Sequence, residues 1–546
     1  MNKKTYLIFF LILISALFLR LYKIHAVPPG VNRDEASIGY TAYSLLLTGR
    51  DEYGIQYPLS FQSFGDWKLP FYIYATVPFV KIFGLSELAV RLPSVIAGIG
   101  TIVLTFIFIK NLFKNVTLAL IVALLVAISP WHIHLSRVES ESNVAVFFIV
   151  LSIVFLLKSV TSKAWFIIPS LLFFALTYYI YAGNYIFTTL LLTGIFILYR
   201  RQLLHNKFLY PGIALFLAFF LLISYHSVFS ANKTKLSGIS IFSDPSIVHE
   251  KIELQRNDHE NQSEIVGKLF HNKVLFATER FVQNYLNSYS PEFLFIKGGE
   301  NRAHNILNFG NMYLIEAPFF LLGIVLLLLS RKKPESKLII FWLLIAPIAS
   351  SITKDAPNTN RMFSVFPALP ITTGIGLYAT LTYSIRHKIM KYGLVFFIFA
   401  ALVNMSIYLD RYYVHFPRNE GEYWGIGYKK LLSTLTEEKY RTKKIIIAKP
   451  EHSHYIFLLF YSAYDPQIYQ RIAKRYPPTN DKFVHVKGYD RFEFRDIDWS
   501  KDIKAKNTLL IDVPEDIPPI IKIKKYSRSE IILPNKRTMF TIVETK

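Results

Sequence analysis

The sequence contains no cysteine among its 546 residues. This absence excludes disulfide bonds, cysteine-ligated metal sites and thiol nucleophiles. Charged residues are also scarce, since they make up 18% of the chain against about a quarter in ordinary soluble proteins. Hydrophobic residues, in contrast, reach 52%. This balance excludes an ordinary soluble enzyme and predicts a protein that crosses a membrane several times.

Several catalytic signatures are missing as well. The chain has no GxSxG elbow, no HExxH zinc motif, no Walker loop and no protein-kinase motif set. A net charge of +23 could indicate a nucleic-acid partner. The basic residues, however, occur in short clusters between apolar runs, which is typical of membrane orientation signals. We therefore expect membrane lipids, and no nucleic acid, around this chain.

Apolar runs of about spanning length predict about eleven membrane helices. The first follows Lys3 and Lys4, and we expect it to be an uncleaved helix rather than a signal peptide. The predicted spans are residues 5–21, 88–109, 116–131, 143–157, 164–180, 185–199, 210–223, 313–329, 338–352, 363–383 and 392–409.

The run 69–84 is apolar but short, and it contains Pro78 and Lys81. If it crossed the membrane, every later span would be inverted. Without it, all short inner loops are basic, as the positive-inside rule requires. We therefore predict an interfacial or re-entrant helix here, a cytoplasmic N-terminus, and location in the cytoplasmic (inner) membrane. A first loop of 22–87 and a large loop of 225–311 then lie on the outer face.

The region 411–546 has no spanning run and lies outside in this topology. Its stretches KKIIIAK, TLLIDV and RTMFTIVET predict strands, and YKKLLSTLTEEKY and SHYIFLLFYSAY predict helices. The sequence thus predicts a transmembrane domain of 1–410 and a small extracytoplasmic α/β domain of 411–546. The second domain is basic, which suits an anionic lipid surface. We also hypothesise that it helps to select the acceptor.

Asp34 and Glu35 lie side by side in the first outer loop. The stretch NRDEASIGY predicts a helix that begins at Asn32, because an asparagine cap followed by carboxylates is typical of helix N-termini. This structural role alone could account for both carboxylates. A catalytic role is the alternative.

Further ionisable residues recur at the outer ends of the predicted spans, and such residues indicate a functional site. A carboxylate with cationic neighbours but no nucleotide-binding loop indicates a general base beside an anionic leaving group. An activated donor on the outer face would have to be linked to a lipid. Structural packing is an alternative role for His304. The candidates are Asp66, Lys68, Arg137, Glu139, His304, Lys354, Asp355 and Arg361.

The run RDEASIGYTAYSLLLTGRDEYG, the stretch SFGDWKLPFYIYATVPFVKIFGLSELAVRLPS and the later SPWHIHLSRVESES resemble the C-type membrane glycosyltransferases. The resemblance is to the bacterial branch of the protein O-mannosyltransferase and aminoarabinose-transferase superfamily. More loosely it includes HNILNFGNMYL and NTNRMFSVFPAL, and it covers about the first 385 residues. It implies a C-type glycosyltransferase fold with juxtamembrane helices on the outer face.

The resemblance also implies residue roles. Asp34 would deprotonate the acceptor hydroxyl, with Glu35 as its support or as a contact to the acceptor. Lys68 and Arg137 would contact the donor phosphate, for which the planar guanidinium is well shaped, and Arg361 is a further candidate. The remaining substrate-binding candidates are Asp66, Glu139 and His304.

Some relatives have an acidic residue directly before the lysine, linked to a metal site. Here that position is Trp67, and Asp66 lies one residue further back. We therefore predict no metal and no other cofactor.

The resemblance accordingly implies inverting transfer of a sugar from a polyprenyl-phosphate donor to a hydroxyl or phosphate of a protein, lipid or cell-envelope glycan. One alternative is an oligosaccharide ligase or polymerase that uses a pyrophosphate lipid. A transporter or flippase is another, although it would favour inverted repeats and charges near mid-membrane. A binding scaffold without catalysis is the third.

Overall fold

A computed structural model describes residues 2–64, 66–229, 240–242, 252–253, 256, 264–386, 388–479, 483–519, 521 and 526–545. The predicted large outer loop, 225–311, therefore lies partly outside the described residues. By its internal contacts the chain divides into two compact units. The helical unit comprises Met1–Arg20, Ile96–Ser136 and Ser140–Tyr408, and the loop–sheet unit comprises Leu21–Val95, Arg137–Glu139 and Leu409–Lys546. The predicted domain limits, 1–410 and 411–546, remain a prediction.

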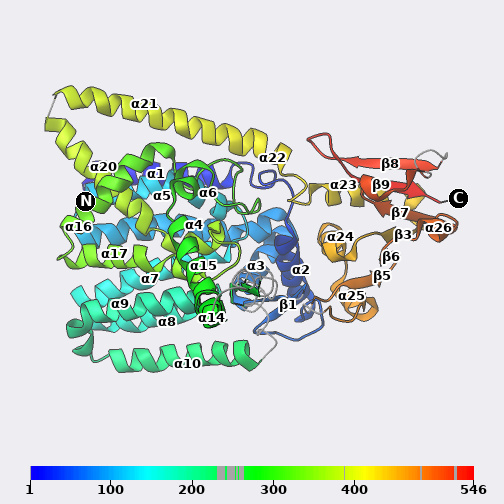
Figure 1. The fold of residues 1–546 in the computed structure, drawn as a ribbon, viewed down its shortest axis with the longest axis horizontal. Helices are drawn as coiled ribbons and strands as arrows, with labels where there is room; N and C mark the ends of the chain where they lie inside the picture. Colours follow the sequence, from blue (N-terminus) through cyan, green and yellow to red (C-terminus); the bar gives the residue numbers. More distant parts are fainter. Residues whose placement is uncertain are drawn as a thin grey trace. The chain divides into compact units, whose positions relative to one another are not determined.

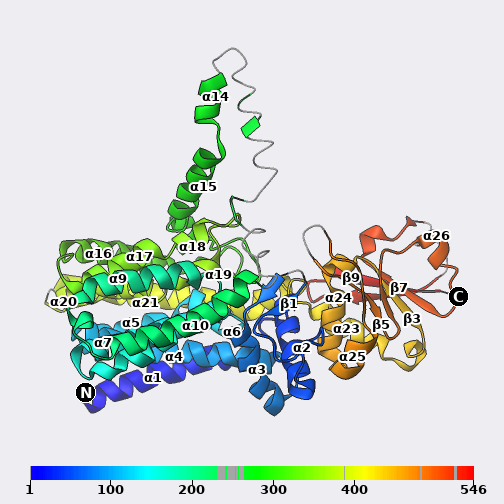
Figure 2. The same cartoon turned by 90° about the horizontal axis from the view of Figure 1, so that it is seen from below.

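Long apolar helices dominate the helical unit. A helix pairs its backbone polar groups by internal hydrogen bonds, as lipid requires, and its apolar side chains suit the hydrocarbon around it. Helices α7, α8, α9 and α10 lie side by side in Figure 1, and α7, α9 and α10 again lie close together in Figure 2. Helix α8 packs against both α7 and α10. The long helices are α1 (Lys3–Leu21), α4 (Glu87–Phe113), α5 (Val116–Ile128), α7 (Glu141–Thr161), α8 (Ile167–Thr177), α9 (Asn184–Leu204), α10 (Leu209–Phe229), α15 (Lys273–Asn287), α16 (Ala317–Leu329), α17 (Pro334–Ile345), α20 (Ala368–Arg386) and α21 (Lys388–Asp410). Shorter elements are α6 (Pro130–Arg137), η1 (Ala164–Phe166), α14 (Glu264–Phe270), η3 (Glu292–Ile296), η4 (Leu314–Glu316), α18 (Ile348–Ser351), α19 (Thr359–Met362) and η5 (Phe363–Val365).

Six helices of the described ranges are long and apolar enough to cross a membrane, or eight if each of two bent pairs is one span. The bends measure 56° between α5 and α6, and 57° between Thr359–Val365 and Ala368–Ser384. Four shorter apolar helices are Pro70–Phe83, Ala164–Thr177, Leu209–Tyr225 and Leu314–Leu329. Each span predicted from the sequence coincides with one of these helices or pairs. The polytopic helical fold is thereby confirmed, while the count of about eleven spans remains a prediction.

The loop–sheet unit begins with α2 (Arg33–Thr48), the short antiparallel strands β1 (Phe61–Ser63) and β2 (Asp66–Lys68), and α3 (Pro70–Phe83). The predicted interfacial run 69–84 is thus a helix, which starts at Pro70 because proline is favoured in a first turn.

The C-terminal region adds η6 (Arg411–His415), α22 (Phe416–Asn419), α23 (Ile426–Leu435), η7 (Glu438–Tyr440), β3 (Lys444–Ile447), η8 (Pro450–His452), α24 (His454–Ser462), α25 (Pro466–Ile472), β4 (Lys474–Arg475), β5 (Val486–Tyr489), β6 (Phe492–Phe494), α26 (Trp499–Asp502), β7 (Thr508–Asp512), η9 (Pro514–Asp516), β8 (Ser527–Ile532) and β9 (Thr538–Glu544).

The C-terminal strands form a mixed sheet in the order β4-β5-β6-β3-β7-β9-β8. Strand β3 lies in its centre and pairs in parallel with both β6 and β7. A central strand is buried on both faces, which explains its run of three isoleucines. One core cluster of the sheet joins Ile446, Leu510 and Val543. The predicted strands in KKIIIAK, TLLIDV and RTMFTIVET and the two predicted helices are all confirmed.

Helix α2 packs against α3 on one side and against α24 and α25 of the C-terminal region on another. The contact with α24 is close at Gly39, where an added Cβ would lie 2.6 Å from the Phe460 ring. The Tyr40 hydroxyl donates to the Tyr464 carbonyl at 3.1 Å, and the Tyr461 hydroxyl accepts from the Val31 amide at 3.1 Å. The loop between α1 and α4 and the C-terminal region therefore belong to one compact unit.

Candidate active site

Helix α2 begins as the sequence predicts. Asn32 is its N-cap, and the Asn32 side chain accepts a hydrogen bond from the Glu35 amide at 2.8 Å. Asp34 and Glu35 both lie in the first turn. Because neighbours on a helix point about 100° apart, they face different surroundings. The Asp34 side chain is 59% exposed, whereas that of Glu35 is fully buried.

Glu35 is bound on both carboxylate oxygens by one arginine. Arg91 Nε donates to Oε1 and Nη2 donates to Oε2, each at 2.9 Å, and both side chains are fully buried. Arg91 Nη1 also donates to the Ile24 and Pro28 carbonyls, at 2.6 and 3.1 Å. Buried charges require this kind of complete pairing. The pair therefore ties the start of α2 to the segment before it and to α4.

Asp34 pairs with the lysine predicted to contact the donor phosphate. Lys68 Nζ lies 2.6 Å from Asp34 Oδ1, and the lysine side chain is only 8% exposed. Lys68 ends strand β2, whose partner β1 places Phe61 opposite it. The hairpin thus brings an ammonium group beside the exposed carboxylate. In a group transfer with an anionic leaving group, a carboxylate can accept a proton while a neighbouring cation stabilises the leaving group.

Phe64 follows β1 and has φ +58°, a left-handed conformation that is rare for a bulky residue and costs about 1–3 kcal/mol. Its ring is nearly fully buried. The guanidinium carbon of Arg33 lies 4.9 Å from the ring centroid and Lys68 Nζ lies 6.0 Å from it. Arg33 is exposed, so it is a second cation near Asp34 that sequence reasoning missed.

Arg137 and Glu139 belong to the same unit. Glu139 donates its backbone N–H to Glu35 Oε1 at 3.0 Å. Arg137 is fully buried and donates to the Tyr22 and Val27 carbonyls at 2.8 and 2.7 Å. Its guanidinium carbon lies over the Tyr412 and Tyr413 rings, 5.4 and 5.2 Å from their centroids. These contacts give Arg137 a role in shaping the segment after α1. Its predicted contact with phosphate remains a prediction.

The other predicted residues are placed less directly. Asp66 lies in β2, but its side chain is outside the described part of the chain. Arg361 and His304 belong to the helical unit. Arg361 forms an ion pair with Asp355, which also accepts from Asn358 Nδ2 at 2.8 Å. His304 is half-buried in a turn. The phosphate-binding role of Arg361 and the substrate-binding roles of Asp66 and His304 remain predictions.

A second acidic pair, Asp51 and Glu52, follows α2. Glu52 is buried, and its Oε1 accepts from the Tyr455 hydroxyl at 3.3 Å. Arg475 donates to the Glu52 carbonyl at 3.1 Å. Burial raises the pKa of Glu52 to about 7, while the charges of Arg475 and Lys68 oppose this rise. The nearby carboxyl of Asp51 raises the pKa of Glu52 further. Burial likewise raises the pKa of Asp51.

Sequence reasoning did not identify this second pair, although a signal was present. Arg50-Asp51-Glu52 repeats the Arg33-Asp34-Glu35 tripeptide. Arg91 also had a signal, because an arginine inside an apolar helix needs a partner. No local pattern, in contrast, could indicate Tyr455 or Arg475, which reach the loop from the C-terminal region.

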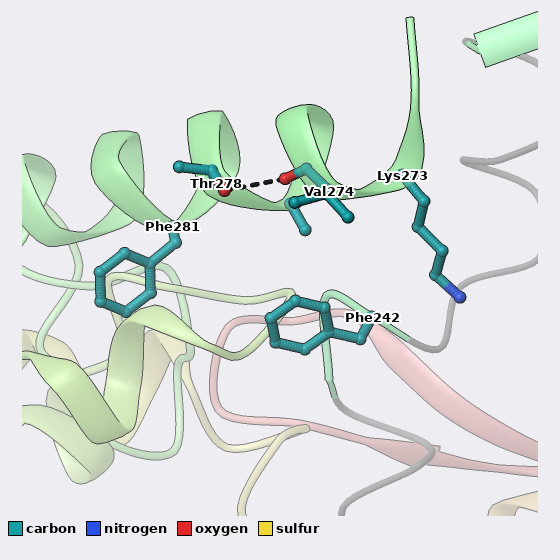
Figure 3. Close-up of a pocket in the computed structure, with 6 residues that line it drawn as sticks. Phe242, Lys273, Val274, Thr278 and Phe281 are labelled. Carbon is teal, nitrogen blue, oxygen red and sulfur yellow. Dashed lines mark hydrogen bonds between the residues drawn. The ribbon is translucent and has the colours of Figure 1, made fainter. Parts of the chain in front are cut away.

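A hollow of about 310 Å³ lies elsewhere, in the helical unit, and is lined by Phe242, Lys273, Val274, Ala277, Thr278 and Phe281. Figure 3 shows the Thr278 hydroxyl donating to the Val274 carbonyl instead of into the hollow. The described residues of this lining include no carboxylate, so they do not offer the base that group transfer requires. Within the described ranges, no three His, Asp or Glu side chains converge in a metal-binding group. The predicted absence of a metal remains a prediction.

Comparisons with known proteins confirm the resemblance inferred from the motifs. Residues 68–226 match the family model of dolichyl-phosphate-mannose-protein mannosyltransferases. ArnT from Cupriavidus metallidurans in the apo state is similar in structure, with a TM-score of 0.55, 13% identity, and coverage of 98% of this chain and 97% of that chain. The same protein bound to undecaprenyl phosphate gives a TM-score of 0.53 and 12% identity, covering 99% and 97%. No curated protein sequence matches. This chain thus has the C-type glycosyltransferase fold of ArnT over nearly its whole length, with the mannosyltransferase family match over residues 68–226.

Proposed function

We propose that this protein transfers a sugar from a polyprenyl-phosphate donor to an acceptor hydroxyl on the outer face of the membrane, with inversion at the anomeric carbon. The observation that supports it most is the pair of exposed Asp34 and nearly buried Lys68, 2.6 Å apart. A protein of the same fold, ArnT from Cupriavidus metallidurans, has been solved with undecaprenyl phosphate bound. A lipid-linked phosphate is therefore the donor class we assign to this chain.

In the proposed reaction, Asp34 accepts the proton of the acceptor hydroxyl. The oxygen attacks the anomeric carbon, the bond between that carbon and the phosphate oxygen breaks, and polyprenyl phosphate leaves. Lys68 stabilises the negative charge that develops on the phosphate. As phosphate and carboxylate compete for this ammonium, donor binding frees Asp34 to act as base.

We assign Glu35 a supporting role. It is buried, and Arg91 and the Glu139 amide bind its oxygens, so it is not in a position to touch an acceptor. It fixes the first turn of α2 and hence the direction of Asp34. The acceptor itself we propose only as a hydroxyl of a protein, lipid or cell-envelope glycan.

The test is transfer by the purified, detergent-solubilised protein, with radiolabelled polyprenyl-phosphate sugars as donors and a membrane extract as acceptor. Wild type runs beside Asp34→Asn, and Glu451→Gln serves as the matched control, since Glu451 is an exposed carboxylate of the C-terminal region. We expect Asp34→Asn to bind donor normally but to lose roughly 10²–10⁴-fold in turnover, which is the usual contribution of a general base. Equal turnover of Asp34→Asn and wild type would disprove the base assignment and direct the search to Glu139.

A further inference from the structure

The hairpin that carries Lys68 is also in contact with the C-terminal region. The Tyr455 ring, on α24, packs with its edge against Phe64, with centroids 6.2 Å apart and planes at 65°. Both rings are almost fully buried. Phe64 is therefore enclosed by Tyr455 on one side, while Arg33 and Lys68 lie over its ring.

Tyr455 is itself fixed by several contacts. Its hydroxyl donates to Glu52 Oε1 at 3.3 Å, and its ring is parallel to that of Tyr469, at 6.4 Å. The Arg475 guanidinium lies over the Tyr53 ring at 4.5 Å and near the Tyr469 ring at 5.8 Å. A continuous set of contacts thus leads from half-buried Arg475 in the C-terminal sheet, through Tyr469 of α25 and Tyr455 of α24, to Phe64.

The conformation of Phe64 supports a role beyond packing. Positive φ at a hairpin end normally selects glycine, asparagine or aspartate. Strained residues persist where their surroundings enforce them, and they cluster at functional sites. An aromatic face attracts cations through its quadrupole. The Phe64 ring can therefore hold a cation, which the side chains of the usual turn residues cannot do in this way.

We propose that Phe64 is a positioning residue: its ring holds Arg33 and Lys68 beside Asp34 for the anionic leaving group, and Tyr455 of the C-terminal region holds the ring. This inference rests on the proposed function and extends it, since it adds Arg33 as a second cation for the donor phosphate. It also makes the C-terminal region part of the support of the donor site.

The test measures binding of two probes to the full-length protein in detergent, undecaprenyl phosphate and undecaprenol. The readout is the ratio of their dissociation constants, because a variant that is merely misfolded weakens both. Phe64→Leu and Tyr455→Leu remove a ring, whereas Phe64→Trp and Tyr455→Phe keep one. Phe83→Leu, at an exposed position of α3, is the matched control.

We expect Phe64→Leu to reduce the preference for the phosphate roughly three- to thirtyfold, as loss of cation–aromatic contacts predicts, and Tyr455→Leu to reduce it in the same direction. Phe64→Trp, Tyr455→Phe and Phe83→Leu should keep it within about threefold. An unchanged preference in both leucine variants overturns the inference. If Phe64→Leu does not fold, Tyr455→Leu decides alone in the same way. If the wild type binds both probes equally, the proposed function is wrong and the inference falls with it.

Discussion

Arg91 and Glu35 form a two-bond ion pair in which neither side chain is exposed, and the two residues lie 56 positions apart in the sequence. The pair holds the N-terminal turn of α2, where Asp34 also lies. A charge left alone in such a place has no water to replace its partner. The pair is therefore a condition for the geometry of the site.

We expect Arg91→Met to destabilise the protein by about 3–5 kcal/mol, since it leaves the Glu35 carboxylate buried and unpaired. The double variant Arg91→Met with Glu35→Gln should recover part of this loss. Thermal unfolding in detergent measures both. Lys501→Met, which removes an exposed pair with Asp498, is the control and should cost less than about 1 kcal/mol. Similar losses in Arg91→Met and Lys501→Met would contradict the structural role of the arginine.

We expect Lys68→Met to lower kcat for sugar transfer roughly 10²–10³-fold, because charge on the leaving phosphate would lose its stabilising cation. Lys68→Arg should retain part of the activity, since it keeps the charge with a different shape. Steady-state kinetics with a polyprenyl-phosphate sugar check this. A rise in KM with kcat unchanged would show instead that the lysine binds donor and transition state equally.

The raised pKa of Glu52 predicts that the stability of the folded protein depends on pH. Its pKa is raised from 4.5 to about 7 in the folded protein, so the folded state holds a proton that the unfolded state releases. The stabilisation is complete below about pH 4.5 and is lost as pH rises through about 7. It amounts to about 3 kcal/mol at most.

Glu52→Gln should abolish this dependence, because the amide is neutral at every pH. We therefore expect the variant to match the wild type near pH 5 and to be more stable than the wild type near pH 8. Thermal unfolding of both proteins across this pH range measures the difference in their stability. The contributions of all other titrating groups are the same in both proteins and cancel in this difference. A constant difference between pH 5 and 8 would contradict the prediction.

Substitution of Gly30 tests the close contact between the loop and the C-terminal region. Its φ is +78°, and an added Cβ would lie 2.5 Å from the Trp424 carbonyl oxygen. Gly54 also has positive φ, +88°, but an added Cβ would meet nothing within 4 Å. Gly54→Ala should thus cost only the backbone strain of about 1–2 kcal/mol, and Gly30→Ala clearly more. Unfolding temperatures that fall equally in both variants would refute the close approach.

Local patterns predicted the elements that depend on local forces. The cap at Asn32 follows from residues within one helical turn, and strands β3, β7 and β9 follow from runs of apolar and β-branched residues. Short strands such as β4 and β6 do not contain enough residues for a recognisable period. They form because the neighbouring strands of the sheet pair with them.

The site was predictable only in part, for the same reason. Asp34 and Lys68 could be selected because sequence motifs contain them, but their contact depends on a hairpin that begins at Phe61. The roles of Tyr455 and Arg475 depend on contacts across about four hundred positions, for which a single sequence offers no signal. Deletion of residues 411–546 would accordingly remove the contacts of α2 with α24 and α25 and leave those with α3.

The contact between the loop that precedes α4 and the C-terminal region has a consequence for biosynthesis. Tyr461, which binds the Val31 amide, follows it by 430 residues. At ribosomal rates of about 5–20 residues per second, the loop waits roughly 20 to 90 s for its partner after it has been synthesised. During that time the face of α2 around Gly39 and Tyr40 is uncovered, and no nascent chain short of α24 can complete the site. Synthesis of α24 is thus required before this face can be covered, and we expect products truncated before α24 to lack the proposed transfer activity.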